Sequence, residues 1–135
     1  MRAFIDSNIF IYAAQAHREF GEGSIKIARD IEKGRLEAYT TSLNISEVAE
    51  VIQRYDSKDT ALEALELLLA LPMEVLPVGK EHIIMAQEIF QKHRINFFDC
   101  VYIAVMDEKF IDTIITNDSH FEGINGIRVI KPREY

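Results

Sequence analysis

The chain has 135 residues, 48% of them hydrophobic and 27% charged, with 22 acidic residues against 15 basic ones. This length and composition are typical of one folded domain with its own core, and they exclude a disordered chain. The net charge of −7 disfavours a protein that binds nucleic acid mainly through basic contacts to phosphates. It leaves open an enzyme that reaches phosphate groups through metal ions, because acids gathered around such ions leave the rest of the surface closer to neutral.

Neither a targeting segment nor a membrane span is expected. The opening "MRAFID" has a charge and a strand-like run where a signal peptide would have an apolar stretch. The longest apolar run, "LELLLALPM", is interrupted by Glu66 and Pro72 and is too short to cross a bilayer. The single Cys100 cannot form an internal disulfide, which suits a reducing compartment. We therefore expect a cytoplasmic protein without membrane contact.

Strands and helices alternate along the predicted chain. Short apolar runs predict five strands, at residues 3–6, 36–41, 73–78, 112–118 and 127–132. Helical spacing of apolar residues predicts six helices, at residues 8–16, 23–34, 43–55, 56–71, 79–95 and 98–109. Thr41 or Ser42 can cap the third helix, and Pro77 indicates a strand end or a sheet edge. With no repeat or linker in sight, this order predicts a single α/β domain, residues 1–135, with a mainly parallel central sheet flanked by helices.

Two acids stand where predicted strands end. Asp6 directly follows "AFI", and Asp118 directly follows "IITN". Sites in parallel α/β sheets form outside the carboxyl ends of the strands, so these carboxylates should open onto one edge of the sheet. Taken singly, each acid is as well explained by a turn or a helix cap.

The helix at 43–55 offers two further acids. Glu47 lies on the flank of the apolar face, roughly 100° from Val48 on the helical wheel, whereas Glu50 lies about 160° away, on the solvent side. We therefore expect Glu47 to reach a cleft and Glu50 to be an ordinary surface charge. A solvated position at the boundary of the helix is the alternative for Glu47.

A fourth acid, Asp99, lies in the apolar helix "FFDCVYIAVM". On the helical wheel it falls on the same face as Ile103 and Met106. An ionised carboxylate is expensive to bury there unless a cation or several hydrogen-bond donors meet it. The alternative is a helix-capping role, because Asp99 stands near the start of the segment.

If Asp6, Glu47, Asp99 and Asp118 converge, their mutual repulsion requires a counter-ion. Hard oxygen ligands suit Mg²⁺ or Mn²⁺, with waters completing the coordination shell. No zinc site is expected, because the four histidines and Cys100 show no zinc-ligand spacing. The sequence also lacks a glycine-rich phosphate loop and a GxSxG elbow.

Four stretches carry a resemblance to a known family. "FIDSNIFIY", "TTSLNISEVAEVI", "INFFDCVYIAV" and "IITNDSHF" resemble the four acidic motifs of PIN-domain ribonucleases, and most of all those of VapC-type toxins of toxin–antitoxin pairs. The resemblance runs from Asp6 to the final strand and implies a three-layer PIN-like fold. It implies that one or two divalent metals are held by the four acids, Asp6, Glu47, Asp99 and Asp118.

The resemblance also implies supporting roles around these acids. Asn8 would orient them through hydrogen bonds, and Thr116 would place its hydroxyl beside them. Many relatives have a further Asp where this sequence has His120, which puts a fifth acid in doubt. Arg54, two turns after Glu47, is a candidate contact for substrate phosphate, and a surface ion pair is its more ordinary role.

The function implied is that of a metal-dependent endoribonuclease acting on RNA, neutralised by a protein antitoxin and forming a homodimer. A housekeeping RNA-processing PIN nuclease and a non-catalytic PIN binding module are the alternatives, and a phosphotransfer receiver is a remoter one. The leucine-rich segment 61–71 is either a buried helix or a partner surface, for a second copy or for an antitoxin.

Overall fold

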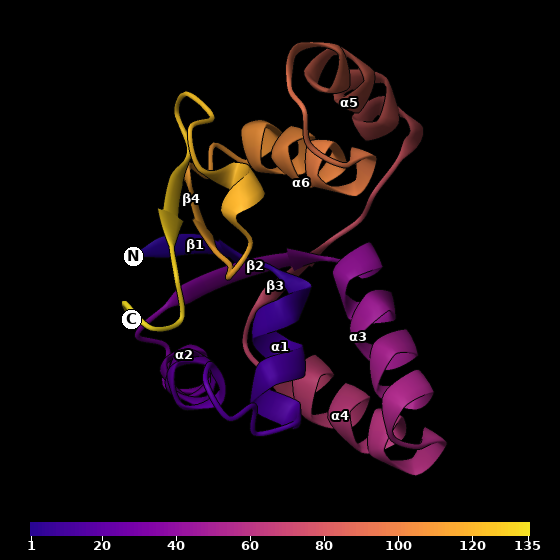
Figure 1. Cartoon of the computed structure of the whole chain (residues 1–135), viewed down its shortest axis with the longest axis vertical. Coiled ribbons are helices and arrows are strands. Elements are labelled where there is room, and N and C mark those ends of the chain that lie inside the picture. Colours follow the sequence, from indigo (N-terminus) through magenta and orange to yellow (C-terminus); the bar gives the residue numbers. More distant parts are fainter.

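A five-stranded, wholly parallel sheet runs through the centre of the computed structural model, which describes all 135 residues (Figure 1). The strands lie in the order β3-β2-β1-β4-β5, so the first strand of the chain is the central one. The register pairs Phe4 with Tyr39 on one side of β1 and Ile5 with Ile115 on the other. The strands are β1 (Arg2–Ile5), β2 (Glu37–Thr41), β3 (Glu74–Leu76), β4 (Thr113–Ile115) and β5 (Arg128–Ile130).

Helices cover both faces of this sheet and give the fold three layers (Figure 1). The first four helices lie on one face, and the last two lie on the other. On the first face α3 packs against α4 and α1 against α2, while α5 and α6 pair on the second. The helices are α1 (Ser7–Ala14), α2 (Gly21–Glu32), α3 (Ser42–Tyr55), α4 (Lys58–Ala70), α5 (Lys80–Lys92) and α6 (Phe97–Glu108).

The central strand β1 is buried on both faces, which explains its continuous apolar sequence. Ala3 and Ile5 belong to the core beneath α1–α4, whereas Phe4 belongs to the core beneath α6. This alternation follows from the two-residue period of a strand. Residues that follow β1 are therefore held by packing on both sides, which gives the end of this strand a fixed position.

The structure confirms the predicted α/β fold, with every expected strand and helix present. Thr41 is the cap of α3, since its Oγ1 accepts a hydrogen bond of 3.1 Å from the Asn44 N–H. The strand before Pro77 is an edge strand, as the proline indicated. Predicted helix ends differ by up to three residues from the observed ones; α5, for example, ends at Lys92. One element was not expected, a single 3₁₀ turn, η1 (Ser119–Phe121).

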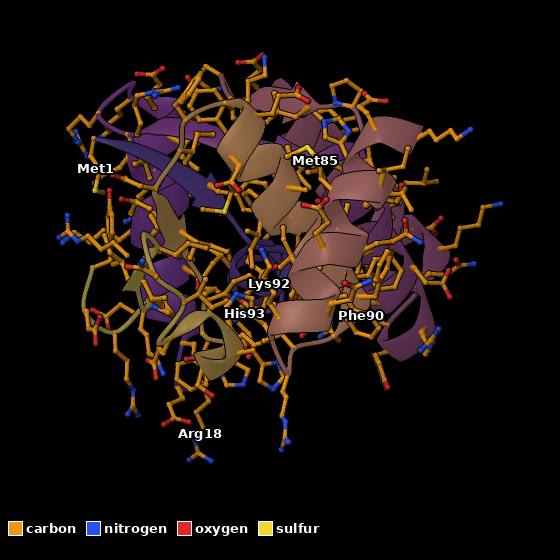
Figure 2. All side chains as sticks on the ribbon, turned by 90° about the horizontal axis from the view of Figure 1, so that it is seen from above. Met1, Arg18, Met85, Phe90, Lys92 and His93 are labelled. Carbon is orange, nitrogen blue, oxygen red and sulfur yellow. The ribbon has the colours of Figure 1, made fainter.

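The outer face of α5 carries exposed apolar side chains. Ile84, Met85 and Phe90 all lie at the surface, and Figure 2 labels the last two on this helix. No helix of the structure is both long and apolar enough to cross a membrane.

Candidate active site

The four acids singled out in the sequence line one cleft, with a volume of about 620 Å³. The cleft lies at the carboxyl end of the sheet, where α1, α3 and α6 begin (Figure 1). Asp6 and Asp118 come from strand ends, while Glu47 and Asp99 come from the helices α3 and α6. The structure thus brings together residues up to 112 positions apart in the sequence.

Asp6 is the N-cap of α1 and immediately follows β1. Its Oδ1 accepts a 2.8 Å hydrogen bond from the Ser7 N–H, and its Oδ2 accepts one of 2.7 Å from the Thr116 hydroxyl. Burial raises its pKa to about 6, with smaller contributions from the charges of Glu47 and Asp118, while the two hydrogen bonds oppose this rise. The carboxylate is therefore held in one orientation in a site crowded with negative charge.

Thr116 connects Asp6 to the end of β4. Besides donating to Asp6, its Oγ1 accepts hydrogen bonds from the Asn8 amide at 3.2 Å and from the Asp118 N–H at 3.0 Å. The Asn8 amide is also 3.3 Å from Asp6 Oδ2. Asn8 and Thr116 therefore contact the acids directly and fix Asp6 relative to the backbone of Asp118.

Glu47 extends from α3 into the cleft, and a chain of hydrogen bonds from hydroxyl and amide groups holds its carboxylate. The Ser7 hydroxyl donates a 2.9 Å hydrogen bond to Glu47 Oε2, and the buried Asn44 amide donates one of the same length to Ser7 Oγ. The Tyr102 hydroxyl lies 3.5 Å from the same Glu47 oxygen. Burial and the charge of Glu47 raise the Tyr102 pKa above its usual value, so Tyr102 stays protonated and acts as a donor.

Glu50 and Arg54 line the outer part of the same cleft. Glu50 is exposed, as expected of a surface charge, and it also forms part of the wall of the cleft. An open cleft has solvent-facing walls, and the wheel angle does not distinguish these from the outer surface. Arg54 forms a 3.0 Å ion pair with Glu50. Exposed pairs of this i,i+4 kind contribute little to stability, so Arg54 can be released to an anionic ligand at little cost.

Asp99 is buried in the first turn of α6, with 5% of its surface exposed. The helix cap is Asn96, whose Oδ1 accepts a 3.0 Å hydrogen bond from the Asp99 N–H, so Asp99 itself is not the cap. Burial raises the Asp99 pKa to about 7, and the charges of Asp118 and Asp6 add to the rise. Its Oδ2 is buried and has no hydrogen-bond partner.

His120, in η1, completes the surroundings of Asp99. Its Nδ1 lies 3.1 Å from Asp118 Oδ1 and 3.5 Å from Asp99 Oδ2. The charge of His120 lowers the pKa of Asp99, against the larger effects that raise it. The turn that carries His120 is capped by Asp118, which accepts a 2.9 Å hydrogen bond from the His120 N–H.

Three side chains of the site were missed by the sequence argument: Ser7, Asn44 and Tyr102. Each could have been found from its position next to a chosen acid. Ser7 stands between Asp6 and Asn8. Asn44 lies three positions before Glu47, and Tyr102 lies three positions after Asp99, so each shares a helix face with that acid.

The donor set fits a hard divalent cation. Carboxylate oxygens are the ligands that Mg²⁺ and Mn²⁺ take from proteins, and several of them meet in this cleft. A buried carboxylate oxygen without a hydrogen bond is unfavourable on its own, and a cation is the partner that would compensate it.

A second group of potential ligands, Glu81, His82 and Glu108, lies elsewhere, between α5 and α6. Both nitrogens of the His82 ring already have polar partners there. Its Nδ1 accepts a 2.8 Å hydrogen bond from the Gly79 N–H, and its Nε2 is 2.7 Å from a Glu108 oxygen. This histidine caps α5 and ties it to α6.

Comparison with known proteins agrees with this geometry. The model of the PIN domain family matches residues 3–127. The chain belongs to the PIN-domain family. A comparison with curated proteins gives no match.

Among solved structures, this PIN domain is similar to VapC20 of Mycobacterium tuberculosis, described as a sarcin-ricin loop cleaving toxin. The TM-score is 0.77 at 17% identity, over 91% of this chain and 95% of that one. It is also similar to a chain of VapBC2 from Rickettsia felis bound to promoter DNA, with a TM-score of 0.74 at 17% identity over 97% and 98% of the chains. A chain of FitAcB from Neisseria gonorrhoeae gives 0.73 at 15% identity, over 100% of both. At these identities the likeness is one of fold.

Proposed function

We propose that this PIN domain is a divalent-metal-dependent endoribonuclease that hydrolyses phosphodiester bonds of RNA. The observation that carries the proposal is the buried Asp99 carboxylate, whose Oδ2 has no hydrogen-bond partner and which shares a cleft with Asp6, Glu47 and Asp118. Such a cluster is unfavourable without a cation and favourable with one. Membership of the PIN-domain family and the ribonuclease-like motifs support the choice of reaction.

Asp6, Glu47, Asp99 and Asp118 would hold Mg²⁺ or Mn²⁺. When bound, the ion supplies positive charge that activates water and offsets the charge developing on the phosphate. Thr116 and the Ser7 N–H keep the Asp6 carboxylate oriented, and Ser7 Oγ and Tyr102 do the same for Glu47. Fixed ligands avoid reorganisation during the reaction.

The attacking group would be water. The only cysteine, Cys100, is fully buried, and the cleft contains no serine or threonine paired with a histidine. Attack by water with loss of the 3′ oxygen leaves a 5′-phosphate on one product. Arg54, released from Glu50, would contact a phosphate of the substrate at the outer end of the cleft.

We further propose that the enzyme is the toxin of a toxin–antitoxin pair. Solved structures of similar fold include toxin–antitoxin complexes. An apolar groove of about 370 Å³ is lined by residues of α1, α2, α3 and α4, among them Phe10, Val48 and Leu67. Leu67 and Leu69 on α4 are 68% and 62% exposed, more than a packed helix would leave. The groove fits the apolar face of an antitoxin helix.

The homodimer is also a proposal. Exposed leucines on α4 and the exposed apolar face of α5 are surfaces that a second copy could cover. Sedimentation of the purified protein, with and without antitoxin, would measure the state of assembly.

The test of the proposed activity is cleavage of a structured RNA by purified protein with Mg²⁺, with Mn²⁺ and in excess EDTA. We expect cleavage only with the metal ions, and 5′-phosphates on the products. Undiminished cleavage in EDTA would refute the metal-dependent mechanism.

A further inference from the structure

His120 presents a ring nitrogen to two of the four acids, Asp118 and Asp99. Its Nδ1 is 3.1 Å from Asp118 Oδ1 and 3.5 Å from Asp99 Oδ2. The second contact is not a hydrogen bond, because Asp99 Oδ2 is without a hydrogen-bond partner. One potential ligand atom from each of Asp99, Asp118 and His120 lies within 4.8 Å of the other two, close enough to share one ion.

The spacing matches neighbouring ligands of an octahedral ion. Metal–ligand bonds of about 2.1 Å at right angles place adjacent ligand atoms about 3.0 Å apart. The distance of 3.1 Å from Nδ1 to Asp118 Oδ1 is close to this value, and the distance of 3.5 Å to Asp99 Oδ2 is longer by about half an ångström. Adjacent ligands do not point at each other but at the ion between them, which agrees with a close contact that is not a hydrogen bond.

The turn that carries His120 fixes its position from both ends. Asp118 caps η1 by accepting a hydrogen bond from the His120 N–H. On the other side Phe121 is fully buried in the core beneath α6. The imidazole therefore stands beside the acids without a flexible loop to place it, although half of its side chain is exposed.

We propose that His120 is a direct metal ligand through Nδ1 and that it shifts the preference of the site from Mg²⁺ towards Mn²⁺. This rests on the proposed metal-dependent function, and it adds a nitrogen ligand to the carboxylates. Mg²⁺ prefers oxygen ligands, whereas imidazole suits transition metals. With Nδ1 bound to the ion, the ring would carry its proton on Nε2.

The proposal is tested on the metal itself, in the absence of RNA. Pulsed electron paramagnetic resonance of Mn²⁺ bound to the full chain should show coupling to a ¹⁴N nucleus. The coupling should disappear in His120→Gln and His120→Asp. It should persist in His93→Gln, a control at the end of α5 that lines a different cleft and is labelled in Figure 2.

Calorimetry gives a second measurement. His120→Asp replaces the nitrogen ligand by an oxygen ligand, so the ratio of Mn²⁺ affinity to Mg²⁺ affinity should fall relative to the wild-type protein. Thermal melts would verify that each variant folds.

The outcomes separate this inference from the proposed function. Mn²⁺ that binds without nitrogen coupling, or an unchanged ratio of Mn²⁺ to Mg²⁺ affinity in His120→Asp, overturns the role of His120 and leaves the proposed nuclease intact. Failure of the wild-type protein to bind either ion overturns both.

Discussion

Replacing Asp99 by Asn should stabilise the metal-free protein at high pH. The folded chain raises the Asp99 pKa from 3.8 to about 7, mainly through burial. Each pKa unit corresponds to about 1.4 kcal/mol, so an ionised Asp99 costs the metal-free fold up to about 4 kcal/mol. Asn keeps the shape of the side chain without this charge, and the helix cap on Asn96 is untouched.

The sign of the pH dependence follows from the raised pKa. The penalty is absent below pH 3.8, where the carboxyl is protonated in both states, and it is complete above pH 7, where the folded protein must also release the proton. The advantage of Asp99→Asn should therefore be largest at pH 8, on the order of 4 kcal/mol, and should fall to less than half of that at pH 5.

Urea denaturation in EDTA at both pH values measures this difference. Asp59→Asn is a matched control, because it removes an exposed carboxylate from the first turn of another helix. It should change stability little at either pH. The reasoning would be refuted by an Asp99→Asn variant that is less stable than the wild type at pH 8, or by an advantage that does not vary with pH. In Mg²⁺ the variant should lose both RNA cleavage and metal-induced stabilisation.

Three further predictions concern the walls of the cleft and the groove. Glu47→Gln should abolish RNA cleavage, whereas Glu50→Gln should leave it nearly unchanged. If both variants fold and lose cleavage equally, Glu47 is not the only acid of α3 that the reaction needs. Thr116→Val should raise the Asp6 pKa further, because the Thr116 hydroxyl donates a hydrogen bond that lowers this pKa. The lost hydrogen bond should also destabilise the fold by about 1–3 kcal/mol. An NMR titration of the Asp6 carboxyl carbon measures the pKa. Leu67→Glu should prevent antitoxin binding in a pull-down without affecting cleavage by the free enzyme.

The fold was predictable because the sequence patterns that specify its strands and helices extend over only a few residues each. The apolar run of β1, the Thr41 cap and the edge proline each act over a few residues, and the structure has a matching element at each place. The acids at strand ends were found by the same logic, because a parallel sheet places its carboxyl ends together.

The contacts among the other residues of the site depend on how the helices are oriented across the sheet. The spacing of Ser7, Asn44 and Tyr102 from the acids can mark them as candidates, but their contacts at Glu47 form only once α1, α3 and α6 are packed, and no local pattern gives those contacts. The position of His120 depends on an irregular turn that has no periodicity to detect.

The central place of β1 in the sheet governs when the site can form during synthesis. This strand is made first, yet one of its two neighbours is β4, at residues 113–115. Asp6 and its partner Thr116 are 110 residues apart, so they meet only after the intervening chain has been made and its loop has closed. A ribosome-bound chain that stops before β4 therefore lacks both Asp118 and the hydroxyl that orients Asp6. The site is therefore among the last parts of this domain to be assembled, because its four acids come together only once β4 and the turn that follows it have been made.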